Sequence, residues 1–123
     1  MKTIVLIACV KEKQKSPCKA IDLYQGKDFK SWVNYSKKIN AQKVYILSGK
    51  HGLLNTDEII APYDFNLNIA NKEYKKKWAH QVLSKLEKET NLKKDTFIFL
   101  TNKIYAENLL IKIKNHHFPL NIK

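Results

Sequence analysis

Three short apolar runs, separated by amphipathic stretches, dominate the pattern of this chain. Residues 3–9, 43–48 and 96–100 are continuous and rich in β-branched or aromatic side chains, as in strands that are buried on both faces. Apolar side chains recur at helical spacing over residues 28–40 and 70–90. The order strand–helix–strand–helix–strand predicts an α/β fold with parallel strands.

The end of the chain predicts one more helix and one more strand. Asn102 can cap a last helix that contains Tyr105, and residues 116–123 can add an edge strand, although Pro119 argues against a central one. We therefore expect a single α/β domain over residues 1–123. Its sheet should be small and mostly parallel, with three to four strands and helices on both faces.

The connections after the first two strands are long and polar. Residues 10–26 form a loop, and residues 49–68 form a connection of a length that is usually functional or contains a short element. Parallel strands end at the same edge of a sheet, so both connections should open over one crevice. Ligands of α/β sheets bind at such an edge.

Side chains in these two connections suit phosphate binding and acid–base chemistry. Lys50 offers a point charge, His51 can change protonation near neutral pH, and the glycines on either side permit close approach to a ligand. The candidate catalytic residues are His51, Asp22 and Asp64. The candidates for substrate or phosphate binding are Lys11, Lys13, Tyr24, Ser48, Gly49, Lys50 and Tyr63. The alternative is structural: a tight turn, aspartates that cap turns and tyrosines that close the core.

The charge of the chain favours a polyanionic partner. The formal net charge is +12, and lysine supplies all of the Lys and Arg total because arginine is absent. Lysine suits phosphate contacts, whereas the absence of arginine disfavours base reading in the major groove. Lys75, Lys76 and Lys77, on the polar side of the long helix, are the candidate nucleic-acid surface. The alternative is a lysine-rich composition with ordinary solvated faces.

Cysteine use and hydropathy bear on the compartment and on cofactors. Two cysteines do not make a disulfide framework in a chain of this length, so we expect a reduced, cytoplasmic protein. No apolar run reaches the length of a membrane span. The cysteines and histidines match no zinc spacing, so we expect no metal and no cofactor. Cys9 ends a strand and is expected to be an inert core thiol.

The second connection resembles the YaaA-like proteins, and in particular small bacterial and phage domains of unknown function. The matching residues are Ser48-Gly49-Lys50-His51-Gly52-Leu53-Leu54, Asp57 and Pro62-Tyr63-Asp64, together with Asp22-Leu23-Tyr24 and the lysines after Cys9. The resemblance covers the N-terminal half well. It implies a nucleic-acid partner, because the larger YaaA proteins are associated with peroxide stress and DNA binding. We expect nucleic acid, DNA before RNA, or a nucleotide.

Together these features predict a cleft that acts on a nucleotide or base, with cleavage or transfer at an N-glycosidic bond as the reaction. Asp22 or Asp64 could stabilise the developing sugar cation or activate water, and His51 could help the base to leave. Tyr24 or Tyr63 could stack on an extruded base.

Two alternatives stay open at this point. One is a non-catalytic DNA-binding or stress-response module that uses the same basic surface. The other is a small-nucleotide sensor in which the turn from Gly49 to Gly52 holds a phosphate.

Overall fold

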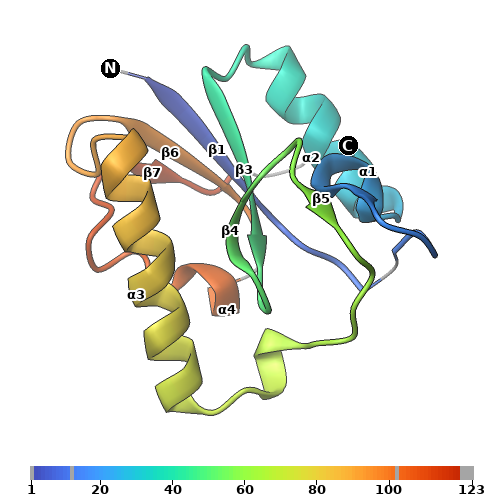
Figure 1. Ribbon diagram of the computed structural model, residues 1–123. Coiled ribbons are helices and arrows are strands. Elements are labelled where there is room, and N and C mark those ends of the chain that lie inside the picture. The colour runs from blue at the N-terminus through green and yellow to red at the C-terminus, as the bar shows by residue number, and fades with distance from the viewer. Residues whose placement is uncertain (1, 12, 102, 120–123) are drawn as a thin grey trace.

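The computed structural model describes residues 2–11, 13–101 and 103–119 of the 123, and a five-stranded sheet forms their centre (Figure 1). The strand order is β4-β3-β1-β6-β7. The strands are β1 (Thr3–Ala8), β3 (Lys43–Ser48), β4 (Gly52–Asn55), β6 (Thr96–Leu100) and β7 (His116–His117). All neighbours pair in parallel except β4, which is antiparallel to β3. The α/β prediction with a mostly parallel sheet is therefore confirmed, with one strand more than the upper expected number.

The extra strand, β4, arises from a tight hairpin. Ser48 pairs with Gly52, so that only Gly49, Lys50 and His51 lie in the turn between the two strands. Gly52 has φ +78°, a left-handed conformation that glycine adopts without steric cost. The sequence motif thus folds back along β3 instead of running away from the sheet.

Short elements divide both long connections, as their length suggests. A second sheet joins β2 (Cys18–Lys19) to β5 (Ile59–Ile60) in antiparallel fashion. The helix α1 (Ala20–Leu23) follows β2, and a 3₁₀ helix, η1 (Leu67–Ile69), precedes the long helix. The prediction that the second connection contains a short element is confirmed.

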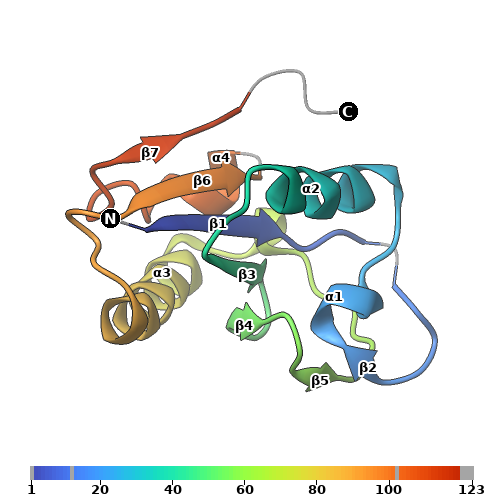
Figure 2. The same ribbon diagram turned by 90° about the horizontal axis from the view of Figure 1, so that it is seen from above.

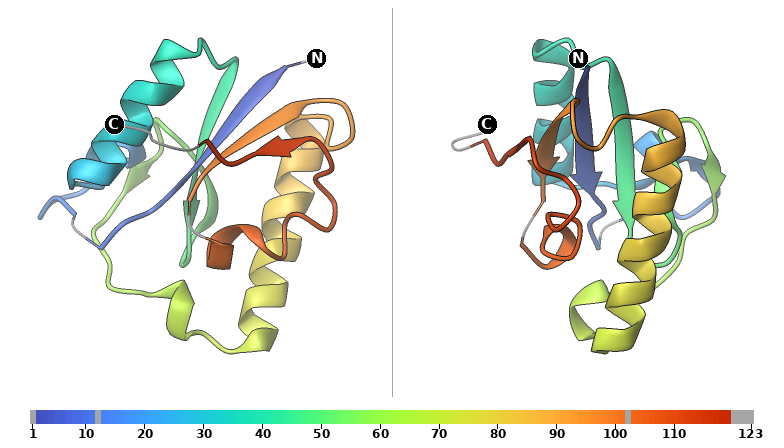
Figure 3. Two further views of the ribbon diagram at one scale, coloured as in Figure 1. Left: turned by 180° about the vertical axis from the view of Figure 1, so that it is seen from behind. Right: turned by 90° about the vertical axis from the view of Figure 1, so that its left-hand side faces the viewer.

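Helices cover both faces of the sheet (Figures 2 and 3). The side chains of β1 alternate between two cores: Val5 and Ile7 pack towards α2 (Lys27–Lys38) and α1, whereas Ile4 and Leu6 pack towards the opposite layer. That layer contains α3 (Lys72–Glu89) and α4 (Lys103–Ala106). The prediction of helices on both faces is confirmed.

The last helix is shorter than its apolar spacing indicates. The helix α4 has four residues and is followed by turns, although Leu109 and Ile113 are still fully buried in the core. The predicted cap, Asn102, lies outside the described residues, as do the last four positions of the predicted edge strand. That strand is short, with only His116–His117 in β7.

The order of the strands creates a crevice at the carboxyl end of the central strand. The chain leaves β1 towards the face that carries α2, and it leaves the neighbouring β6 towards the face that carries α4 (Figure 2). Ligands of open α/β sheets bind where neighbouring strands diverge in this way.

Candidate functional site

A cleft of about 430 Å³ lies at the carboxyl end of β1. Its walls come from the loop after β1, the segment that leads into η1, and α4. The lining residues are Cys9, Val10, Lys11, Lys13, Asp64, Phe65, Asn66, Asn68, Ile69 and Tyr105. Of the candidates predicted from the sequence, Lys11, Lys13 and Asp64 therefore meet in one cleft.

Neither lysine of the cleft forms a salt bridge with a carboxylate among the described residues. Among the residues that the structure describes, the salt bridge is between Lys85 and Glu58, 4.0 Å apart, and neither Lys11 nor Lys13 takes part in one. The ammonium of Lys13 donates to the carbonyl oxygen of Lys11 at 3.2 Å, which leaves further N–H donors of that ammonium for a ligand. The cleft is therefore suited to an anion.

Cys9 and Tyr105 form the inner end of the cleft. The Cys9 sulfur lies 3.2 Å from the Tyr105 hydroxyl, and the Tyr105 ring packs edge-on against Trp78. Burial raises the pKa of Tyr105 far above its usual value, so that the phenol stays protonated at neutral pH. Cys9 is half-buried between the core and the cleft, so it is not enclosed in the core as the sequence suggested.

A chain of hydroxyl groups lies beside the cleft. The Tyr24 and Tyr63 hydroxyls are 2.5 Å apart, the Tyr63 hydroxyl is 2.7 Å from the Ser48 Oγ, and the backbone N–H of His51 donates to that Oγ at 3.0 Å. Burial raises the pKa of Tyr24 to about 12 and raises the pKa of Tyr63 further. Both phenols are thus protonated at neutral pH, and the chain ties the β3–β4 turn to the segment around Tyr63.

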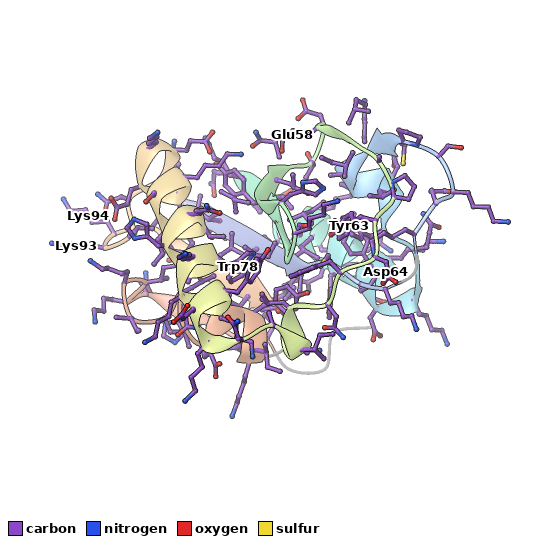
Figure 4. The ribbon with its side chains drawn as sticks, turned by 60° about the horizontal axis from the view of Figure 1, so that its bottom comes forward. Glu58, Tyr63, Asp64, Trp78, Lys93 and Lys94 are labelled. Carbon is purple, nitrogen blue, oxygen red and sulfur yellow. The ribbon has the colours of Figure 1, made fainter. Side chains whose placement is uncertain are left out.

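Cationic and imidazole side chains surround the ring of Tyr63. The Lys13 ammonium lies 4.5 Å from the ring centroid, the Lys50 ammonium lies 5.6 Å from it, and the His51 ring stands edge-on at 5.1 Å. Tyr63 precedes Asp64 on the same extended segment (Figure 4). Tyr63 therefore connects the hydroxyl chain and the β3–β4 turn with the cleft.

His51 is biased towards its neutral form. Partial burial, and then the positive charge of Lys50, lower the pKa of His51 below its ordinary value of about 6.5. At pH 7 the neutral ring carries one N–H donor and one acceptor nitrogen. His51 does not line the cleft, and its ring contacts that of Tyr63, the residue before Asp64.

The lowered pKa of His51 gives a testable dependence of stability on pH. Below about pH 6.5 the unfolded chain binds a proton at this position more readily than the folded protein does, so that protonation favours unfolding. We expect the melting temperature of His51→Gln to fall less than that of the wild type as the pH is lowered from 7.5 to 5.5. A control, His80→Gln, removes an exposed histidine from α3. Identical pH profiles for His51→Gln and the wild type would contradict the assignment.

Other predicted candidates lie outside the cleft. Asp22 is exposed on α1 and lines two neighbouring hollows, so the structure does not bring it together with Asp64. Tyr24 is only 1% exposed, which leaves its ring no open face for a base. The three adjacent lysines proposed as a nucleic-acid surface lie in the first half of α3, away from the cleft lining; they are Lys75, Lys76 and Lys77.

Gly49 has a packing role in this structure. A Cβ at this position would lie 3.1 Å from the Leu67 Cβ and 3.1 Å from a ring carbon of Phe65, so a larger residue would require these neighbours to shift. The Gly49 carbonyl accepts a hydrogen bond from the Tyr74 hydroxyl at 2.7 Å. The turn thus packs against the η1 segment, which forms one wall of the cleft.

Sequence reasoning missed the wall that the η1 segment provides. Phe65 is half-buried, Ile69 is 85% exposed, and Asn66 and Asn68 line the cleft with them. The Asn66 Oδ1 accepts from the Asn68 N–H at 2.9 Å and caps η1. The sequence signal was the polar, asparagine-containing stretch directly after Asp64 in a long connection.

The described part of the chain shows neither a metal-binding cluster nor a membrane-spanning helix. It holds no group of three or more histidine, cysteine, aspartate or glutamate side chains placed to bind a metal ion. None of its helices has both the length and the apolar character that a membrane crossing requires.

A comparison with known protein families matches nearly the whole chain. The model of a family of unknown function, DUF6884, matches residues 4–123. No curated protein and no solved structure matches the chain.

Proposed function

Since this chain belongs to that family of unknown function, its activity has to be inferred from its own cleft, and we propose that it is a nucleic-acid-associated domain that binds one nucleotide there. The cleft would then act on the N-glycosidic bond of that nucleotide. The observation that carries the proposal is the convergence of Lys11, Lys13 and Asp64 at the carboxyl end of the central strand.

The chemistry of the lining fits the parts of a nucleotide. Lys11 and Lys13 offer charged donors to a phosphate, while Phe65 and Ile69 offer an apolar wall to a base. The volume of about 430 Å³ lies within the range of small-ligand sites. A carboxylate weakens a site for phosphate alone, so the presence of Asp64 favours a ligand with a second, electron-poor group.

Asp64 is the residue best placed to act on the sugar. In hydrolysis the bond from the sugar carbon to the base nitrogen breaks, and its electron pair goes to the base, which takes up a proton. Water adds to the sugar carbon and loses a proton, so that one water molecule is consumed in all. A carboxylate stabilises the cationic sugar or takes the proton of the water. The protonated Tyr105 phenol lines the cleft and can donate to the leaving base, whereas His51 would act from across the Tyr63 ring.

We also propose that the chain is related to the YaaA-like proteins. Its motif residues lie in the β3–β4 turn and in the segment that carries Tyr63 and Asp64, next to the cleft. The resemblance supports DNA as the macromolecular partner, while the two cysteines, too few for a disulfide framework, support a cytoplasmic location.

A non-catalytic binding module is the second candidate. Asp22 and Asp64 line separate hollows, so the described residues place one carboxylate in the cleft where two would assist acid and base steps. In that case the cleft holds a nucleotide without turnover. The sensor alternative has less support, because Gly49 of its phosphate-binding turn is buried beneath η1.

Nucleotide binding tests the proposal directly. We expect Lys11→Gln/Lys13→Gln to weaken the binding of nucleoside monophosphates about tenfold or more, because each charged hydrogen bond contributes on the order of 1.5–3 kcal/mol. The matched control is Lys93→Gln/Lys94→Gln, which removes the same charge from an exposed turn far from Asp64 (Figure 4). Titration calorimetry measures both variants. Equal losses in the two would contradict a phosphate site in the cleft.

A further inference from the structure

We propose that the cleft is one end of a longer groove that binds a single nucleic-acid strand. This inference extends the proposed function, since it names the substrate class as single-stranded nucleic acid in preference to a free nucleotide or an intact duplex. The path would run from the carboxyl end of β1, around the loop before α1, and on between α1 and α2.

One hollow adjoins the cleft, and a second hollow adjoins the first. One, of about 430 Å³, lies along residues 13–18, and the other, of about 560 Å³, lies between α1 and α2. Lys13 lines both the cleft and the first hollow, while Gln14 and Asp22 line both hollows. Shared walls of this kind make the three depressions successive parts of one groove.

Positive charge recurs along the whole path. The lysines in order are Lys11, Lys13, Lys15, Lys30 and Lys37, and the aspartates that line the three depressions are Asp22 and Asp64. Among the described residues none of these lysines takes part in a salt bridge. A row of unneutralised cations that follows a groove is the electrostatic arrangement that tracks a phosphate backbone.

The floor of the groove is partly apolar, as bases require. Ile21 and Val33 are half-buried between α1 and α2, and Phe65 and Ile69 form a wall at the cleft end. Bases of a single strand are free to pack on such surfaces, whereas bases in a duplex are stacked on one another. Chemistry at an N-glycosidic bond also requires an unstacked base, which a single strand presents at lower cost.

A duplex fits this face less well. The chain has no arginine for paired contacts to guanine, and lysines suit contacts to a phosphate backbone instead of base reading in a major groove. A curved path along three hollows suits a flexible strand.

Binding of an oligonucleotide series tests the groove. Labelled strands of one, two, four and eight nucleotides, as DNA and as RNA, are titrated by fluorescence anisotropy at several salt concentrations, with a duplex of eight base pairs alongside. Affinity should rise with length to roughly four nucleotides or more, the lower end of known single-strand site sizes. Five lysine–phosphate contacts give an expected salt slope of about −3.5. The DNA and RNA arms identify the strand that is preferred.

A pair of double variants locates the path. Lys30→Gln/Lys37→Gln should make the salt slope for long strands shallower by about 1.4 and leave nucleoside monophosphate binding unchanged. The matched control, Lys93→Gln/Lys94→Gln, should alter the slope by less than about half a unit. Melting curves show whether each variant is folded.

Three results would overturn the groove: affinity that stops rising at one nucleotide, equal slope changes in the two double variants, or tighter duplex binding that depends on Lys75, Lys76 and Lys77. A different result would overturn only the nucleotide site of the proposed function. In that case long strands bind with the expected dependence on Lys30 and Lys37, but no nucleoside monophosphate binds.

Discussion

Replacing Trp78 with alanine should reduce the free energy of unfolding by about 3–5 kcal/mol, the range for large aromatic side chains removed from a core. Trp78 is 3% exposed on α3, and its ring packs edge-on against Tyr105. Its indole N–H donates to the Ser48 carbonyl oxygen at 2.7 Å, in a fully buried position. Trp78 thus holds α3 against the end of β3, where the hairpin turn begins. Urea unfolding measures the loss.

Two further variants separate packing from hydrogen bonding. Trp78→Phe keeps an aromatic ring but leaves the Ser48 carbonyl without the indole donor, which should cost about 1–3 kcal/mol. Lys76→Ala, on the exposed face of the same helix, should stay within about 0.5 kcal/mol of the wild type. A Trp78→Ala variant as stable as Lys76→Ala would show that this contact does not hold the turn.

The main strands and helices could be predicted because their signal is local. The runs 43–48 and 96–100 coincide with β3 and β6, since strands covered on both faces are apolar along most of their length. The long helix begins within two residues of its predicted start because Asn71 caps it, with its side chain accepting from the Tyr74 N–H.

The remaining elements depend on partners that are distant in the sequence. β2 and β5 have two residues each and exist only by pairing across about forty residues, as Cys18 with Ile60 shows. β4 was not predicted for a similar reason, since its hairpin depends on the turn geometry at Gly52 and on pairing with β3. In both cases, short stretches carry too little periodicity to be recognised alone.

The candidate site was predictable as far as parallel topology determines it. Because parallel strands end at one edge, the lysines after β1 could be expected near the segment of Asp64, and the cleft does contain Lys11, Lys13 and Asp64. No comparable rule determines the direction of the short helix α1, so the position of Asp22 outside the cleft was not predictable. The same holds for contacts between remote positions, such as that of Cys9 with Tyr105.

Replacing Asp64 with asparagine should lower the rate of base release by a factor of about 10² or more, the scale of lost acid–base catalysis. The amide keeps the size of the side chain but neither takes a proton from water nor stabilises a developing cation by charge. Asp64 is exposed, so the melting temperature should not change. Nucleotide affinity should stay the same or increase, because a negative charge beside the phosphate-binding lysines disappears. The measurement is base release from single-stranded oligonucleotides and nucleosides with a panel of normal and modified bases.

The matched control is Asp22→Asn, because both aspartates are exposed, each lines a hollow together with Lys13, and of the two only Asp64 lines the cleft. We expect Asp22→Asn to change the rate of base release by less than about threefold, since a hundredfold loss of rate requires the removal of a group within reach of the reacting atoms. Equal losses in the two variants would indicate that the reaction takes place closer to α1 than the cleft is. If the wild type releases no base from any substrate while nucleotides still bind, the cleft belongs to a binding module and Asp64 shapes specificity alone.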